Sequence, residues 1–94
     1  MRVKWTRTAL SNLDSEASYI ALDDPAAASR MVSRIVNGVA ALRAHPAMGR
    51  PGRVPGTREL VVGGTPYLIP YRVKNGALEI LRVFHHSRKC PESL

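Results

Sequence analysis

The sequence is poor in cysteine and has no long apolar run. Cys90 is the only cysteine among 94 residues, so no disulfide can form within the chain and a reducing compartment is expected. A membrane-spanning helix needs about eighteen or more consecutive apolar residues, and no such stretch occurs. The first residues, MRVKWTRT, lack the apolar centre of a signal peptide. These absences predict a cytoplasmic protein with no membrane association.

Acidic residues are also scarce, and they are absent from the middle of the chain. Lysine and arginine total 14 against 7 acids, a formal net charge of +7. No Asp or Glu occurs from Pro25 to Arg58, a region in which arginines accumulate: Arg30, Arg34, Arg43, Arg50, Arg53 and Arg58. A small basic domain favours a polyanionic partner, either nucleic acid or an acidic protein segment. The alternative is a surface whose charge only keeps the protein in solution.

The first half of the chain has the pattern of a short strand followed by two helices. Residues 2–5 alternate as in a strand, and Thr6 or Thr8 can cap the helix that follows. Asp24-Pro25 predicts the start of a second helix, which ends at His45-Pro46 because a proline disfavours helical geometry in the residue before it. The apolar stripes are Leu10, Leu13, Ala17, Ile20 and Ala21 in the first helix, and Ala28, Met31 or Val32, Ile35, Val39 and Leu42 in the second.

Two further features concern the second helix. Gly38 lies inside it, which predicts close packing against a neighbour. The two helices are separated only by a tight turn and should therefore form an antiparallel hairpin. Residues 45–57, which follow, are rich in glycine and proline and predict an ordered loop.

In the second half the apolar period changes to two, which predicts strands over residues 58–62, 66–73 and 77–84. Asn75-Gly76 between the last two is a strong hairpin signal. Tyr67, Ile69, Tyr71 and Val73 share the face that should pack on the helices, while Leu68, Pro70 and Arg72 share the other. Pro70 cannot donate a ladder hydrogen bond, so a bulge or the end of a neighbouring strand is expected there, and the register of the last hairpin stays open.

The predicted fold is a single α+β domain over residues 1–94. An N-terminal strand and an antiparallel helical hairpin pack on a three- to four-stranded antiparallel sheet. The 45% hydrophobic content suits one modest core for a chain of this length.

The order of several motifs resembles the RelE/ParE superfamily of toxins from bacterial type II toxin–antitoxin systems, and within it the ParE-like branch. The motifs are VKWTRTAL, DDPAAA, LRAHPAMGRPG, TRELVV, TPYLIPYRV and ILRVFHHSR, which together cover nearly the whole chain. The resemblance implies two N-terminal helices packed on a twisted antiparallel sheet. It also implies a cognate, ParD-like antitoxin whose acidic, amphipathic C-terminal segment wraps the toxin in a hetero-oligomer. An arginine-rich surface with apolar patches suits such a segment.

The resemblance allows two activities. RelE-like members cleave mRNA on the ribosome, whereas ParE-like members inhibit DNA gyrase and lack the nuclease residues. RelE-like nucleases carry an arginine directly after the first tyrosine of the middle strand, where this chain has Leu68. Leucine can neither pair with a phosphate nor transfer a proton. Residues 45–58 also contain arginines but no lysine to match the basic loop of the nucleases. Both departures weigh against ribonuclease activity.

The segment FHHSRKC, residues 84–90, has two competing interpretations. One histidine beside Arg82 or Arg88 can serve as a general base, but His85 and His86 would point to opposite faces if strand geometry continued and could not chelate one metal. No second cluster has metal-ligand spacing, so neither a metal nor another cofactor is expected. His85 and Arg88 match the His-x-x-Arg pattern of ParE-like sequences. They are interpreted as scaffold and partner-contact positions.

The leading hypothesis is therefore a toxin that binds DNA gyrase, has no chemistry of its own and is held inactive by an antitoxin. Its contact residues are expected among Arg50, Arg53, Arg58, Leu68, Arg72, His85 and Arg88. The first alternative is a ribosome-dependent ribonuclease that uses His85, His86, Arg72, Arg82 and Arg88. The second is a non-toxic homologue that acts only with the antitoxin in repressing its own operon.

Overall fold

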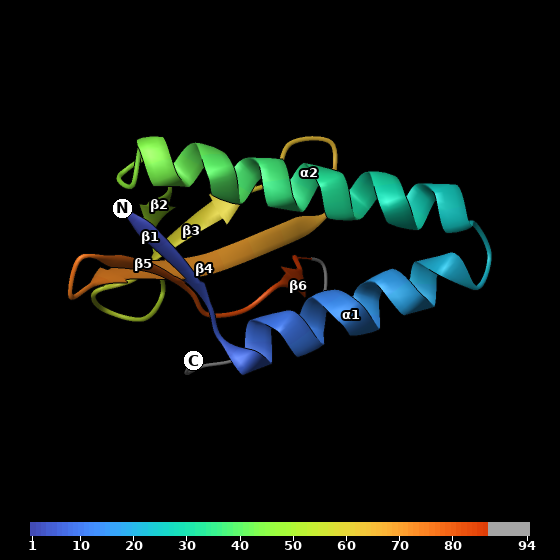
Figure 1. The fold of residues 1–94 in the computed structure, drawn as a ribbon, viewed down its shortest axis with the longest axis horizontal. Helices are drawn as coiled ribbons and strands as arrows, with labels where there is room; N and C mark the ends of the chain where they lie inside the picture. Colours follow the sequence, from blue (N-terminus) through green and yellow to red (C-terminus); the bar gives the residue numbers. More distant parts are fainter. Residues whose placement is uncertain (87–94) are drawn as a thin grey trace.

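The computed structural model describes residues 1–86, in which two helices pack on one face of a mixed sheet (Figure 1). The elements, in chain order, are β1 (Arg2–Trp5), α1 (Arg7–Ala21), α2 (Pro25–Ala44), β2 (Arg50–Pro51), β3 (Arg58–Val61), β4 (Tyr67–Lys74), β5 (Ala77–Ile80) and β6 (Phe84–His85). The α+β class and the helical hairpin are confirmed. Arg88 and Cys90 lie outside the described residues.

The helices begin and end at the predicted residues. The Thr6 hydroxyl accepts a hydrogen bond from Ala9 N at 3.1 Å, and the Asp24 carboxylate accepts one from Ala27 N at 3.1 Å. Pro25 occupies the first turn of α2, and His45 caps its end. Each N-terminal cap satisfies a backbone donor that the helix itself leaves unpaired. A turn of three residues joins the helices, which lie side by side in Figure 1.

The sheet has more strands than predicted, and it is not purely antiparallel. Its order is β1-β5-β4-β3-β2, with β6 paired to β4. β1 lies parallel to β5, with Val3 opposite Leu78 and Trp5 opposite Ile80. The sequence predicted β1 as a strand without its partner, and β2 falls within the segment predicted to be a loop.

β5 and β6 are separated by a bulge opposite Pro70. Tyr71 is paired with Ile80 and Leu68 with Phe84, so the three residues 81–83 face the two residues 69–70. Leu81 N still donates to Pro70 O at 2.9 Å, but Pro70 has no backbone N–H with which to donate a second ladder hydrogen bond. The prediction of a bulge or strand end at Pro70 is confirmed, whereas a continuous strand over residues 77–84 is wrong.

The core lies between the helices and the sheet. From α2 it contains Met31, Ile35, Val39 and Leu42, and from β4 it contains Tyr67, Ile69 and Tyr71, all at most 6% exposed. Two predicted core positions are wrong: Leu10 is 51% and Val73 49% exposed, and Ala9 is buried in place of Leu10. A Cβ on Gly38 would lie 3.2 Å from Leu60 Cδ2, which confirms the predicted close packing of α2 on β3.

Candidate functional site

The sheet face turned away from the helices contains Leu68, Pro70 and Arg72, as predicted. Leu68 is only 3% exposed, and Pro70 is fully buried as well. By its resemblance to RelE-like nucleases, Leu68 stands where those proteins have an arginine. Because its side chain is buried, Leu68 offers almost no surface for a partner. Its role as a contact residue stays a prediction.

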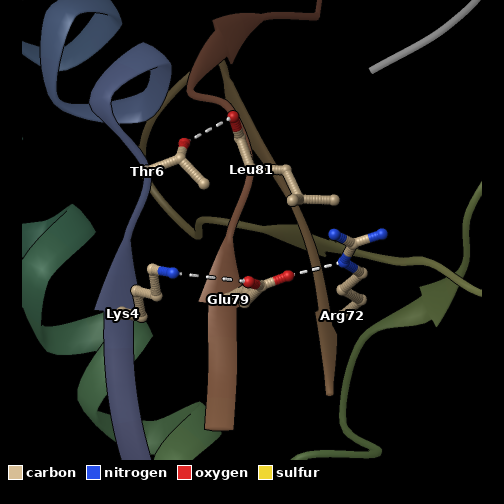
Figure 2. A network of polar contacts seen from close by, with 5 residues as sticks. All are labelled: Lys4, Thr6, Arg72, Glu79 and Leu81. Atoms are coloured by element: carbon tan, nitrogen blue, oxygen red, sulfur yellow. Dashed lines mark hydrogen bonds and ion pairs between the residues drawn. The ribbon is translucent and has the colours of Figure 1, made fainter. Parts of the chain in front are cut away.

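Arg72 lies on the same face and is tied into a charged network (Figure 2). Its Nε donates to Glu79 Oε1 at 2.6 Å across the β4–β5 hairpin, and Lys4 Nζ lies 4.0 Å from the other oxygen of that carboxylate. The hydrogen bond from Arg72, together with its charge and that of Lys4, lowers the pKa of Glu79 below its usual value of 4.5, although desolvation opposes the shift. This arginine already has a carboxylate partner.

His85 lies on the opposite side of the sheet from Arg72. It is paired with Tyr67, and paired residues of adjacent strands project to the same face. The His85 ring meets the Tyr67 ring edge-on, with centroids 5.6 Å apart. The chain turns after His85, so the strand geometry does not continue to His86, whose exposed ring lies 5.8 Å from that of His85. The condition under which the two rings would face opposite sides of the sheet is therefore not met.

Two of the side chains proposed for a ribonuclease, Arg72 and His85, lie far apart in the structure. Arg72 and Tyr67, the residue opposite His85, are separated by five positions of β4, roughly 16 Å at strand spacing. Their side chains also occupy different faces of the sheet. Arg82 lies in the bulge, and its Nε is buried without a hydrogen-bond partner within residues 1–86. The histidine and Arg72 thus cannot act on one phosphate in this arrangement.

Two of the three candidate arginines after α2 hold the loop in place. Arg50 Nη2 lies 3.2 Å from Glu59 Oε1, a carboxylate whose residue is 5% exposed. Arg58 donates to Gly49 O at 2.8 Å and to Ala47 O at 3.3 Å. Glu59 therefore pairs with Arg50, not with its neighbour Arg58. The partner of Arg53 is again Glu59, but through the Arg53 backbone N–H at 3.3 Å, which leaves the exposed side chain available.

Tyr71 anchors the same loop from the core. Its hydroxyl donates to Pro46 O at 2.7 Å and accepts from Gly49 N at 2.8 Å. A side chain on Gly49 would collide with that hydroxyl, since a Cβ would lie 2.5 Å from it. These bonds explain why a segment rich in glycine and proline is ordered, as predicted.

A cavity of about 470 Å³ lies between the helical hairpin and the β3–β4 turn. Its walls come from both helices, from the turn and from His85: Tyr19, Ile20, Ala27, Arg30, Met31, Arg34, Gly64, Thr65, Pro66, Tyr67 and His85. Arg30 and Arg34 were not among the predicted site residues. Their spacing of four, beside the buried Met31 and Ile35, was the signal that could have identified them, because it places both on one face of α2 next to the core.

Metal ligation has no support within residues 1–86, where no group of three His, Cys, Asp or Glu side chains is placed to hold an ion. Within the same residues, neither helix has the length and apolar character needed to cross a membrane. Among the described residues, the recognisable features are thus the charged side chains described above and a cavity lined in part by Arg30 and Arg34.

Comparison with known proteins agrees with this architecture. Residues 3–90 match the family model described as the ParE toxin of the type II toxin–antitoxin system parDE. The chain is 50% identical over 93 residues to the Y4kP protein of Sinorhizobium fredii, covering 99% of this chain and 96% of the relative. It is 38% identical over 87 residues to Toxin RelE2 of Caulobacter vibrioides, covering 93% and 97% respectively.

A solved structure shares the fold as well. A chain from the chromosomal ParDE toxin–antitoxin system of P. aeruginosa superposes with a TM-score of 0.81 at 39% sequence identity, covering 90% of this chain and 95% of that one. The match extends over the helical hairpin and the sheet, which hold the features described above. This chain therefore belongs to the ParE family of toxins from type II toxin–antitoxin systems.

Proposed function

We propose that this ParE-family toxin arrests growth by binding DNA gyrase in the cytoplasm and does so without cleaving RNA. The observation that carries the proposal is the separation of Arg72 and His85 onto different faces of the sheet. A metal-independent ribonuclease needs a base and phosphate-binding cations around one scissile bond. Leu68 adds support, since an apolar side chain occupies the position of the nuclease arginine.

We further propose that a cognate antitoxin with an acidic, amphipathic segment neutralises the toxin. The formal charge of +7 favours rapid encounter with such a segment, and exposed apolar side chains such as Tyr19 and Leu22 offer anchors on the helical hairpin. Contacts are proposed at Arg50, Arg53, Arg58, Arg72, His85 and Arg88. Arg53 is the most available of the loop arginines, because its side chain is exposed.

A supercoiling assay with purified gyrase and purified toxin tests the proposal. We expect toxin to inhibit supercoiling in a dose-dependent manner, and we expect stoichiometric antitoxin to restore it. Supercoiling that is unaffected at micromolar toxin, while induction still arrests growth, contradicts gyrase as the target.

The rival activity is ribosome-dependent mRNA cleavage. The similarity of this chain to Toxin RelE2 is the reason to test it. Mapping of mRNA 5′ ends after induction distinguishes the two. Clustered cuts within translated codons that vanish in His85→Ala or His86→Ala would establish the rival. Induction without growth arrest would instead point to a non-toxic homologue that serves only in operon repression with its antitoxin.

A further inference from the structure

The cavity between the helical hairpin and the β3–β4 turn has a cationic wall. α2 contributes Arg30 and Arg34, which lie one helical turn apart and project to the same side. Among the described residues that line the cavity, none is acidic. The nearby carboxylate of Asp24 is half-exposed and lies 3.9 Å from Arg30 Nη2, at the limit of an ion pair.

The guanidinium of Arg34 is positioned by the turn that forms the opposite wall. Its Nη1 donates to Gly63 O at 3.4 Å, and no other hydrogen bond of this side chain is formed within the part of the chain that the structure describes, so its other donors can serve a ligand. The group lies so close to Gly64 that a Cβ there would be 2.5 Å from Nη1. Gly64 also adopts a left-handed conformation, with φ +75°, which a side chain would disfavour.

The turn itself is braced. Thr65 N and the Thr65 hydroxyl both donate to Val62 O, at 3.2 and 2.9 Å, and the hydroxyl accepts from Tyr67 N at 3.2 Å. A wall held in this way loses little conformational entropy when a ligand binds.

The remainder of the cavity is apolar. Ile20 and Met31 from the helices and Pro66 from the turn line it, and Tyr19 stands at its exposed edge with 67% of its surface accessible. The volume of about 470 Å³ lies within the range of roughly 300–1,000 Å³ that is usual for ligand sites. A fitting occupant therefore combines an anionic group with an apolar body.

We propose that this cavity is a carboxylate-binding subsite that receives an acidic side chain of the antitoxin. The carboxylate lies between Arg30 and Arg34 and takes paired hydrogen bonds from the planar guanidinium of Arg34. An apolar neighbour in the antitoxin packs against Ile20 and Met31. This inference rests on the proposed neutralisation by an acidic polypeptide, and it is independent of the toxin's cellular target.

A polypeptide suits the cavity better than a nucleic acid does. Non-specific strands of nucleic acid bind along continuous grooves lined with cations. The next arginine of α2 after Arg34 is Arg43, nine residues away, or about 14 Å along the helix. In addition, a nucleic acid would place its polar sugars and charged phosphates against the apolar walls of the cavity, which is an unfavourable contact. Tyr19 could stack on a base, so a phosphate-bearing probe belongs in the test.

The test uses purified toxin and three small probes: benzoate, its neutral isostere benzamide, and phenyl phosphate. Binding is followed by backbone amide shifts in NMR titrations, with thermal shift as a second measure. We expect benzoate to bind in the millimolar range and to shift the amide signals of residues 63–65. Arg34→Gln should weaken this binding about tenfold, because it removes the paired, charge-assisted bonds.

Two further variants show whether geometry matters as well as charge. Arg34→Lys keeps the charge but loses the planar fork, so we expect binding of benzoate between that of the wild type and Arg34→Gln. Arg43→Gln, a change of the same charge on the same helix outside the cavity, should bind benzoate as the wild type does. Benzamide binding as tightly as benzoate, or equal binding by Arg34→Gln and the wild type, overturns the subsite.

The occupant is tested with the toxin–antitoxin complex. If an antitoxin carboxylate fills the cavity, benzoate should no longer shift the signals of residues 63–65 in the complex. Benzoate binding that is unchanged in the complex overturns the antitoxin as occupant. If phenyl phosphate binds more than tenfold tighter than benzoate, the cavity prefers phosphate to carboxylate. That result also overturns the antitoxin as occupant and favours a nucleic acid as the ligand. Gyrase takes no part in these measurements, so failure of the gyrase proposal leaves their outcome readable.

Discussion

The arginines at the two ends of α2 differ in what they contact, although both groups come from the same acid-free stretch of sequence. Beyond the C-terminal end, Arg50 meets the buried carboxylate of Glu59, and Arg58 bonds two backbone carbonyls. Near the N-terminal end, the polar contacts of Arg30 and Arg34 within residues 1–86 are long, at 3.9 and 3.4 Å, and both side chains line a cavity.

The difference shows that the number of arginines does not define a binding surface. An arginine whose donors are already satisfied by buried acceptors contributes to stability, and releasing it to bind a partner costs those hydrogen bonds. An arginine beside a cavity keeps its donors for a ligand. Stability measurements on the isolated toxin can therefore separate the two groups before any partner is known.

The largest expected effect concerns the hydroxyl that anchors the loop. Tyr71→Phe removes the donor to Pro46 O and the acceptor for Gly49 N. Because buried polar groups lose their partners, we expect the free energy of unfolding to fall by about 1–3 kcal/mol, measured by urea denaturation. Tyr19→Phe is the matched control, since Tyr19 is 67% exposed, and it should be nearly neutral. An equal effect of the two changes would contradict the anchoring role.

A smaller effect is expected at Arg58. Arg58→Gln removes the hydrogen bonds to the carbonyls of Ala47 and Gly49. The loss of these charge-assisted bonds should lower the free energy of unfolding by about 1 kcal/mol in urea denaturation. Arg43→Gln, at an exposed position of the last turn of α2, should change it by less than about 0.5 kcal/mol. If both variants lose the same stability, Arg58 is not a structural residue.

The cavity arginines should have almost no effect on stability. We expect Arg30→Gln and Arg34→Gln each to change the free energy of unfolding by less than about 0.5 kcal/mol, in either direction, in urea denaturation. Like charges four residues apart on a helix repel by roughly 0.2–0.5 kcal/mol, and relief of that repulsion offsets part of the weak attraction that each variant removes. A loss above about 1 kcal/mol for either variant would show that this arginine stabilises the fold, as Arg50 and Arg58 do. The proposed difference between the two groups of arginines would then be wrong.

The smallest effect is a pH dependence at Glu79, the partner of the surface arginine Arg72. The pKa of Glu79 is lower in the folded protein than its usual 4.5, so its contribution to stability is present above pH 4.5 and declines as the pH falls through the folded value. Wild type and Glu79→Gln should therefore differ most at neutral pH and converge in acid, as measured by urea denaturation from pH 7 to about pH 3. A difference that is constant across this range would show that Arg72 and Lys4 do not act on the carboxylate.

Local signals predicted most of the secondary structure. Thr6, Asp24-Pro25 and His45-Pro46 set the helix ends through backbone geometry and capping, which act within a few residues. Asn75-Gly76 forms the two-residue turn between β4 and β5, and both residues have positive φ. Such signals do not name a strand's partner, which is why the parallel pairing of β1 with β5 was not predicted.

The candidate site was harder to predict. The sequence placed Arg50 in an ordered loop and Arg58 at the start of a strand, but the acceptors that hold them lie nine to eleven positions away in the chain. The importance of Arg30 and Arg34 depends on the β3–β4 turn, which approaches α2 only in the folded protein. The number of charged residues in the sequence shows neither which acceptors hold Arg50 and Arg58 nor that the β3–β4 turn approaches α2.

The sequence by itself determined where the helices and most strands begin and end, the basic character of the chain, and its family. Only the tertiary structure decided which side of the sheet His85 faces. The bulge opposite Pro70 adds one residue to the β5–β6 side of the pairing, and because side chains alternate along a strand, that residue moves His85 to the helix side, beside Tyr67 and away from Arg72.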